Sequence, residues 1–463
     1  MRLTDDLKYT DQLLQLTKEF SSKFLSATDK LAPHKEIRSL PSVSLPVAGL
    51  GGVATLEKFR QHYGDALTAA TGPRYWGFVT GGVTPAALMG DWITSVLDLN
   101  GSNSGSVAAH IEKDVVEQLR KLFGLPEQFL GAFVSGATMA NFTGLAMARQ
   151  WIGEQQGVNI AADGLSAVKD IKVLAAVPHS SILKSMSMLG IGRNNLVRIP
   201  AIPNRESIDL HALEYYLREH PGQSFIIVAS AGTVNTVDFD DIAALAVLKK
   251  KYNCWLHVDA AFGGFAACSE DFAHLLQGWE EADSITVDAH KWLNVPYDAA
   301  MIFARHPALQ LSVFQNPGAA YLGDPFASFH YSNYIPENSR RLRALPVWFT
   351  LQAYGQEGYR YIVDNNVRLA RKLGTYIAAE PALKLLAPVR LCVVCFTLDV
   401  AAAEQEAAVD GLLERINNSG VVYMTRTVYA GQAAIRAALV NWRTTDKDIE
   451  IVWATMQKML IRK

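Results

Sequence analysis

The chain has 463 residues, 49% of them hydrophobic and 19% charged, and its 43 Lys and Arg nearly balance its 45 Asp and Glu, which gives a formal net charge of −2. This composition is typical of a globular protein of two or three domains, and no basic excess indicates a nucleic acid or an anionic membrane as a partner. The charged N-terminus, the absence of a run of 18 uncharged apolar residues and the presence of only four cysteines predict a cytoplasmic protein without a transmembrane helix or a disulfide framework.

Residues 1–95 are predicted to form an N-terminal helical segment. Its first 60 or so residues have a helical pattern, with a connector rich in Pro, Ser and Gly at "LPSVSLPVAGLGG". An irregular loop is expected over Arg74–Gly82, and Pro85 suits the first position of a helix. A further helix is expected in "HIEKDVVEQLRKLFGLP", because its apolar residues have helical spacing and the run closes with glycine and proline.

Residues 96–340 are predicted to form a large α/β domain. Helical patterns over Met139–Gln150, Leu210–Glu219 and Ile242–Tyr252 separate short apolar runs, which favours a mainly parallel sheet buried on both faces. Ligands of such sheets bind beyond the carboxyl ends of the strands, so polar residues there are candidates for a site. The expected strands are "GAFVSG", "IKVLAAVP", "NLVRIP", "SFIIVASAG", "CWLHVDAA", "SITVDAH" and "AAMIFAR".

Residues 341–463 are predicted to form a smaller α+β domain, with a long helix around Gln356–Ala378 followed by strands and a final helix. Cys392 and Cys395 form a C-x-x-C in this region, for which metal or redox chemistry is one interpretation. The continuous apolar run "LCVVCF" favours a buried strand instead, and no second cysteine or histidine pair completes a zinc site, so no metal is expected.

Three predicted strand ends carry residues suited to a flat, phosphorylated ligand. In "VSGATMAN", the N–H groups of Ala137 and Thr138 and the Thr138 hydroxyl would form an anion cradle, or only a capped turn. His179, in "AVPHSSILKS", would stack on a planar ring or only cap a helix. Asp259, in "LHVDAAFGG", would pair with an arginine or keep a heteroaromatic nitrogen protonated, and the small residues after it leave room for a ring.

Lys291 is the most informative of these candidates. It follows a predicted strand in "ADSITVDAHKWLNVPYDAAM" and precedes bulky apolar residues, which a solvated surface lysine does not need. A lysine amine in a pocket of low dielectric becomes nucleophilic toward an aldehyde. Together with a phosphate cradle, a stacking imidazole and a carboxylate, this lysine predicts a site for pyridoxal 5′-phosphate.

In these stretches the sequence resembles the group II pyridoxal-dependent amino-acid decarboxylases, which include aromatic-amino-acid, histidine, glutamate and diaminobutyrate decarboxylases. Further matching stretches are "SAGTVNTVDFDDI", "SRRLRALPVWFTLQAYG" and "IRAALVNWRTT", and the resemblance spans roughly residues 73–445. It implies the PLP-dependent transferase fold of type I, pyridoxal 5′-phosphate as cofactor, an amino-acid substrate and a homodimer to whose interface residues 1–95 contribute.

The resemblance also implies a role for individual residues. The implied catalytic residues are Lys291, which binds the cofactor covalently, Asp259 at the pyridinium nitrogen, His179 on the ring, and Tyr331 or Tyr334 of the loop Ala319–Arg341 as proton donor. The further implied cofactor contacts are Ala137, Thr138, Thr233, Ala261, Asp288 and His290, and the implied substrate contacts are Phe78, Val79 and Arg436. Three positions depart from the family's pattern: Ala137 stands where a second glycine is common, Val234 where a second threonine is common, and Asp288 where asparagine is common.

The expected activity is decarboxylation of an L-amino acid to an amine and CO2. An aromatic or bulky substrate is weakly favoured by Trp76, Phe78 and Val79. Arg74 or Arg193 would instead serve an acidic substrate, and a diamino acid is a further alternative. A PLP-dependent lyase or aminotransferase of the same fold is an alternative. A degenerate binding subunit is another, against which the intact Lys291 and Asp259 argue.

Overall fold

The computed structural model describes residues 2–37, 39–102, 106–317 and 329–461. Its centre is a seven-stranded sheet in the order β1-β7-β6-β5-β4-β2-β3. Neighbouring strands from β3 through β6 run parallel, and β7 runs antiparallel to both β6 and β1. The prediction of a mainly parallel α/β sheet is therefore confirmed. The strands are β1 (Leu130–Val134), β2 (Val173–Ala175), β3 (Leu196–Arg198), β4 (Phe225–Ser230), β5 (Cys254–Asp259), β6 (Ser284–Val287) and β7 (Ala300–Ala304).

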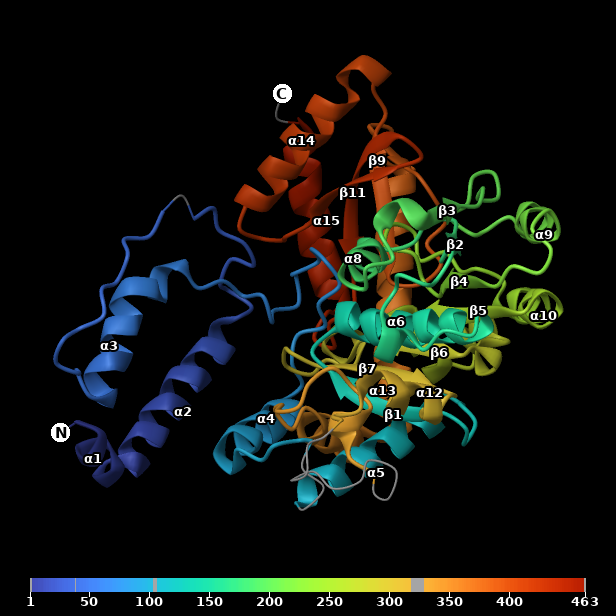
Figure 1. Cartoon of the computed structure of the whole chain (residues 1–463). Coiled ribbons are helices and arrows are strands. Elements are labelled where there is room, and N and C mark those ends of the chain that lie inside the picture. The colour runs from blue at the N-terminus through green and yellow to red at the C-terminus, as the bar shows by residue number, and fades with distance from the viewer. Residues whose placement is uncertain (1, 38, 103–105, 318–328, 462–463) are drawn as a thin grey trace.

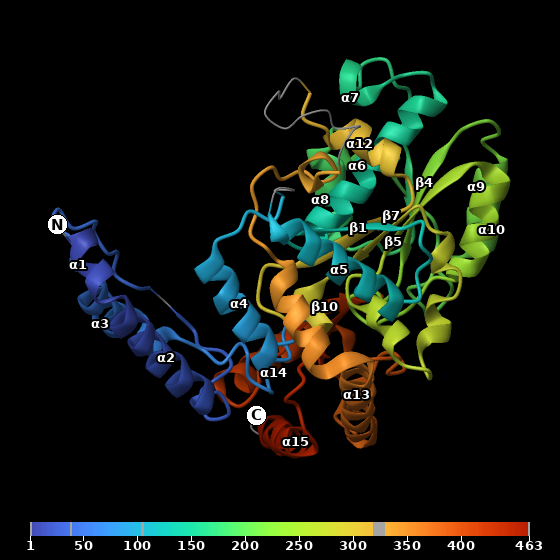
Figure 2. The ribbon, with the colours of Figure 1, turned by 90° about the horizontal axis from the view of Figure 1, so that it is seen from below.

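The sheet is covered by helices on both faces, as Figures 1 and 2 show. Every residue of β4, β5, β6 and β7 is buried, because the apolar side chains of these strands point alternately into two helical layers. One layer contains α6, and the other contains α9 and α10. The helices of this region are α5 (Val107–Leu122), α6 (Ala137–Gln155), α7 (Ile160–Asp163), α8 (Ser180–Met188), α9 (Leu210–Arg218), α10 (Ile242–Tyr252), α11 (Ala289–Trp292) and α12 (Pro307–Phe314).

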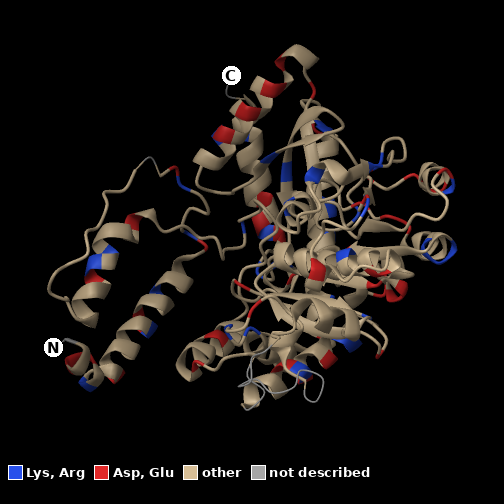
Figure 3. Cartoon of the chain, viewed as in Figure 1, with Lys and Arg blue, Asp and Glu red and all other residues tan. Residues whose placement is uncertain are grey.

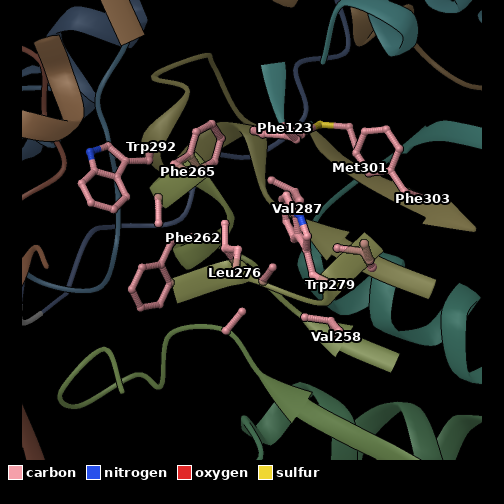
Figure 4. Close-up of a cluster of buried hydrophobic side chains, with 14 of the residues drawn as sticks. Phe123, Val258, Phe262, Phe265, Leu276, Trp279, Val287, Trp292, Met301 and Phe303 are labelled. Atoms are coloured by element: carbon pink, nitrogen blue, oxygen red, sulfur yellow. The ribbon is translucent and has the colours of Figure 1, made fainter. Parts of the chain in front are cut away.

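Aromatic side chains dominate the core on one face of this sheet. The ring of Phe123 meets the rings of Phe265, Trp279 and Phe303 edge to face, at centroid distances of 5.5 to 6.1 Å. Figure 4 shows this cluster continuing past Val287 of β6 to Trp292 of α11. The apolar residues that follow Lys291 in sequence therefore anchor its short helix in the core.

A second sheet belongs to the C-terminal part of the chain. Its strands are antiparallel, in the order β10-β11-β9-β8, with the ranges β8 (Leu383–Leu385), β9 (Val393–Leu398), β10 (Thr425–Tyr429) and β11 (Gln432–Ala438). The helices here are α13 (Ala344–Ala379), α14 (Ala402–Asn418) and α15 (Asp446–Ile461). Gly355 breaks α13 with a φ of 59°, so the helix expected from Gln356 is its second half, and its first half was not predicted.

The N-terminal helices stand apart from the rest of the chain (Figures 1 and 2). They are α1 (Arg2–Lys8), α2 (Thr10–Ala27) and α3 (Gly52–Tyr63), and neither α2 nor α3 contains a buried residue. The next helix, α4 (Pro85–Leu97), packs on α13 and begins with Pro85 as predicted, capped by Thr84. The divisions at residues 95/96 and 340/341 stay predictions.

Residues of both charges are interspersed along the ribbon in the view of Figure 3. Across the described ranges, no helix has both the length and the hydropathy that a membrane crossing requires.

Candidate active site

A cavity of about 520 Å³ opens at the carboxyl ends of the parallel strands. Its walls come from the segments that follow β1, β2, β4, β5 and β6, and from the 78–80 loop and β11. The structure thus brings together residues that lie far apart in the chain, at the edge of the sheet where the sequence predicted a site. The predicted residues that line the cavity are Phe78, Val79, Ala137, Thr138, His179, Thr233, Asp259, Ala261, Asp288, His290, Lys291 and Arg436.

Lys291 lies on α11, directly after β6. Its Nζ is 3.6 Å from Oδ2 of Asp288 and 5.5 Å from the ring centroid of Phe262. The backbone of Gly81 presses against this turn so closely that an added Cβ would lie 1.9 Å from the carbonyl oxygen of Lys291. The 78–82 loop therefore needs glycine at position 81 to pack against the turn that carries the lysine.

Asp259 ends β5, and its carboxylate is held by amide donors. Oδ2 accepts a hydrogen bond of 2.9 Å from the side-chain amide of Asn141, and Oδ1 accepts one of 3.2 Å from the N–H of Ala261. Among the described residues, no arginine pairs with this carboxylate, so the structural ion pair left open by the sequence is not seen. Asp259 is only 8% exposed, and a buried carboxylate held by amide donors is suited to face a protonated ring nitrogen.

His179 both caps a helix and lines the cavity. Its Nδ1 accepts a hydrogen bond of 3.2 Å from the N–H of Ser181 and lies 2.8 Å from the Ser181 hydroxyl. Burial lowers the pKa of His179, with Asp259 opposing this and Lys291 adding to it. The two interpretations of this histidine in the sequence are therefore compatible: the neutral ring caps α8 through one nitrogen and faces the cavity.

The expected phosphate cradle is the start of α6. Ala137 opens this helix after β1, and its N–H donates to Oδ2 of Asp288 at 3.3 Å. Burial raises the pKa of Asp288 to about 6, against the lowering effect of Lys291. Burial, helped by Lys291, lowers the pKa of His290 to about 4. The cradle thus contains a neutral imidazole and a carboxyl that takes up a proton easily.

Within the described part of the chain, two buried polar atoms at this cavity have no hydrogen-bond partner, namely Oδ1 of Asp288 and Nε of Arg436. Arg436 is 6% exposed and donates through Nη1 to the carbonyl of Val234 at 2.8 Å. Burying a guanidinium N–H without an acceptor is unfavourable, so this donor is suited to an anionic group of a ligand. The residues present therefore fit pyridoxal 5′-phosphate together with a substrate carboxylate.

Several lining residues were missed by the sequence analysis, among them Thr80, Phe262 and Tyr297. Tyr297 places its hydroxyl 2.9 Å from that of Thr80, and its ring centroid is 4.2 Å from that of His290. Burial raises the pKa of Tyr297. Phe262 lies in "LHVDAAFGG", the stretch quoted for Asp259, but the sequence analysis gave it no role. Tyr297 could have been found from its position in the connection between β6 and β7. Because these two strands are antiparallel, that connection lies at the edge of the sheet where β6 ends, which is the edge with the cavity.

The two tyrosines predicted as proton donors lie elsewhere in this chain. Tyr331 is 2% exposed and packs 5.1 Å from the guanidinium of Arg340, and Tyr334 stacks on Phe329. Neither lines the cavity, and residues 319–328 of their loop lie outside the described residues. Their role as donors stays a prediction.

The remaining candidates also have defined positions. Arg74 forms an ion pair of 2.7 Å with Asp448, and Arg193 lies in a short 3-10 helix away from the cavity lining. Cys392 directly precedes β9 and Cys395 lies within it. Both are buried and free, as the strand interpretation predicted. The described part of the chain holds no group of three or more His, Cys, Asp or Glu side chains arranged to bind a metal.

Comparison with known proteins agrees with this geometry. The family model described as the pyridoxal-dependent decarboxylase conserved domain matches residues 53–399. An aromatic-L-amino-acid decarboxylase of Bacillus atrophaeus is 26% identical over 426 residues, which covers 89% of this chain and 86% of the relative. A phenylacetaldehyde synthase of Petunia hybrida is 27% identical over 418 residues, covering 86% and 82%.

Solved structures share the fold over almost the whole chain. Tryptophan decarboxylase of Catharanthus roseus, solved with L-tryptophan, has a TM-score of 0.87 at 21% identity and covers 98% of each chain. The 4-hydroxyphenylacetaldehyde synthase of Rhodiola rosea also has a TM-score of 0.87, at 22% identity and the same coverage.

Proposed function

The chain belongs to the family of pyridoxal-dependent decarboxylases and is a pyridoxal-phosphate-dependent carboxy-lyase, and we propose that it acts on an aromatic L-amino acid to give the amine and CO2. One observation carries the choice of substrate. Among the described residues, Lys291 and Arg436 are the only lysine and arginine that line the cavity.

Lys291 and Arg436 would both be needed for any amino-acid substrate. Lys291 would hold the cofactor, and Arg436 would bind the α-carboxylate through its unpartnered Nε. The described lining then offers no third lysine or arginine for an acidic side chain, and the guanidinium of Arg74 is engaged by Asp448. The rest of the wall favours an aromatic ring, since it includes the apolar surfaces of Phe78, Val79, Val177, Phe262 and Tyr297.

When bound, pyridoxal 5′-phosphate supplies an electron-withdrawing ring that accepts the electron pair of the broken Cα–carboxylate bond. We propose that Asp259 keeps the proton on the ring nitrogen, because its ionised carboxylate stabilises the pyridinium charge. His179 would cover one face of the ring with a neutral imidazole. Arg436 would orient the substrate carboxylate so that its bond to Cα stands perpendicular to the ring, and this orientation selects the bond that breaks.

Decarboxylation must end with a proton at Cα. Tyr331 and Tyr334 remain the proposed donors, on the premise that a partner subunit supplies the loop to this cavity and that Tyr331 leaves its packing against Arg340 there. We therefore also propose a homodimer. Apolar residues exposed on the projecting N-terminal segment support it, as does a cavity of about 1110 Å³ among α1, α3 and their connector. These exposed residues include Leu3, Leu7, Leu14, Val43, Leu45 and Val47.

The homodimer is tested by sedimentation of the full chain and of Leu14→Asp, which puts a charge on the exposed face of α2. The full chain should sediment with twice the mass of one chain, and the variant should sediment as a monomer. A monomeric wild-type chain that turns over substrate would exclude the shared loop. We also propose a cytoplasmic location, which the four free cysteines support.

The substrate proposal is tested by CO2 release from Tyr, Trp, Phe, DOPA, Glu, Asp and 2,4-diaminobutyrate. Release from at least one aromatic substrate, with Glu and Asp inactive, is the expected result, and the opposite preference would refute the proposal. Amine and aldehyde products are measured separately, because relatives of similar identity include both an aromatic-L-amino-acid decarboxylase and a phenylacetaldehyde synthase. A keto acid formed without CO2 would instead indicate an aminotransferase.

A further inference from the structure

Behind the cavity wall, a chain of buried side chains connects the two residues that flank the proposed cofactor ring. Asn141, on α6, is fully buried, and its side-chain nitrogen lies 2.9 Å from Oδ2 of Asp259 and 2.9 Å from the hydroxyl oxygen of Ser181. Its side-chain oxygen lies 2.9 Å from Nε2 of His257. Ser181 continues to Nδ1 of His179 at 2.8 Å.

The direction of every hydrogen bond in this network follows from the chemistry of its ends. An ionised carboxylate only accepts, so Asn141 must turn its amide hydrogens toward Asp259 and Ser181. The amide oxygen then faces His257, whose Nε2 must carry a hydrogen. His257 is fully buried, and burial lowers its pKa to about 4, so the ring is neutral and its Nδ1 must accept.

The far end of the network agrees with this assignment. The hydroxyl of Ser284 lies 2.8 Å from Nδ1 of His257 and accepts a hydrogen bond of 3.1 Å from the indole N–H of Trp255. Trp255 can only donate, so the Ser284 hydroxyl is free to donate to His257. Gly144 makes room for the imidazole against α6, because an added Cβ there would lie 2.6 Å from the ring.

The near end determines the state of His179. Ser181 accepts from Asn141 and therefore donates its hydroxyl hydrogen to Nδ1 of His179, which also accepts the Ser181 N–H at 3.2 Å. A nitrogen that accepts twice carries no proton. His179 therefore carries its hydrogen on Nε2, toward the cavity.

We propose that Asn141 is a positioning residue that orients the carboxylate of Asp259 and, through Ser181, sets the tautomer of His179, so that the cofactor ring meets an ionised acid and a neutral imidazole. This inference rests on the proposed function for the identity of the ring. The network itself is a property of the chain and exists without the cofactor.

The test compares two substitutions at fully buried positions of the same helix, α6. Asn141→Leu keeps the volume but removes both donor and acceptor. Thr143→Val is the matched control, because Thr143 is equally buried and its hydroxyl donates only within its own helix, to the carbonyl of Met139. Two quantities are measured: the imidazole ¹⁵N shifts of the cofactor-free protein, which report the tautomer at each histidine, and the dissociation constant of pyridoxal 5′-phosphate.

The wild-type and Thr143→Val proteins should show His257 and His179 as Nε2–H tautomers. In Asn141→Leu these signals should shift toward a mixture of tautomers, and the cofactor should bind at least ~10-fold more weakly, because a carboxylate loses a donor. His257→Gln, which retains a donor toward Asn141, should bind the cofactor more tightly than His257→Met, which does not.

The outcomes separate this inference from the function on which it rests. If Asn141→Leu matches Thr143→Val in both tautomers and affinity while the wild type binds cofactor at Lys291, the inference is wrong and the proposed function stands. If the wild type has the expected tautomers yet takes up no cofactor, both the proposed function and the role assigned to Asn141 are wrong. Local misfolding alone would weaken binding in His257→Gln and His257→Met equally, which would also overturn the inference.

Discussion

Oδ1 of Asp288 lies 3.0 Å from Nδ1 of His290, and the two atoms do not form an ion pair. The imidazole is neutral at ordinary pH, since burial and Lys291 lower the pKa of His290 to about 4, and its Nδ1 accepts the N–H of Ala299. The carboxyl therefore faces another acceptor and has no donor at Oδ1. A proton on Asp288 resolves this contact, in agreement with its raised pKa.

Replacing Asp288 by asparagine should stabilise the cofactor-free protein in a pH-dependent manner. Burial raises the pKa of Asp288 from its ordinary 3.8 to about 6, so folding favours the protonated form. The stability linked to this proton is fully present below about pH 4 and is lost as the pH rises through about 6. The asparagine variant does not lose it, so its advantage in unfolding free energy should grow with pH toward a limit of about 3 kcal/mol.

Denaturant unfolding of both proteins at pH 5 and pH 7.5 measures this difference. Asp271→Asn, at an exposed carboxyl, is the control and should show no such trend. An advantage of Asp288→Asn that is absent or independent of pH would contradict the proposed proton uptake.

Replacing Lys291 by alanine should abolish covalent attachment of the cofactor and reduce turnover to background, because no other amine lines the described cavity. Borohydride reduction of the wild-type holoprotein followed by peptide mass analysis should label Lys291. Lys251→Ala, on the surface, should be labelled and active like the wild type. A label on a different lysine would refute the assignment.

Replacing Asp259 by alanine should lower kcat by at least ~100-fold, since the ring nitrogen then loses the charge that keeps it protonated. The rate of CO2 release is measured at saturating cofactor, so that weaker cofactor binding does not imitate the effect. The absorbance spectrum of the bound cofactor should change as well. Rates within a few-fold of the wild type would remove Asp259 from the mechanism.

Replacing Arg436 by glutamine should raise KM and also lower kcat, because the guanidinium both binds the α-carboxylate and orients its bond to Cα. Loss of a charge-assisted hydrogen bond of about 1.5–3 kcal/mol corresponds to roughly 10- to 150-fold in KM. Arg426→Gln, at an exposed arginine of the neighbouring strand, is the control and should leave KM unchanged. An unchanged KM in Arg436→Gln would show that the carboxylate binds elsewhere.

Most of the architecture could be predicted from patterns that depend on few neighbours. The strands β4, β5 and β6 are buried on both faces. Their sequences are therefore largely apolar instead of alternating between apolar and polar residues. The first half of α13 was missed, because Pro346 and the glycine at position 355 interrupt the pattern, although proline is tolerated in the first turn of a helix.

The sequence by itself determined which residue types stand at the strand ends, and with them the cofactor chemistry of Lys291, Asp259 and His179. These residues follow their strands directly, so the local pattern is enough to bring them to one edge of a parallel sheet. The tertiary structure alone decided that Asn141 reaches Asp259 across 118 positions of sequence, that Arg74 is engaged by Asp448 and that Tyr297 faces the cavity. Such contacts depend on how helices and loops pack over the sheet, and no local spacing in the chain records that packing.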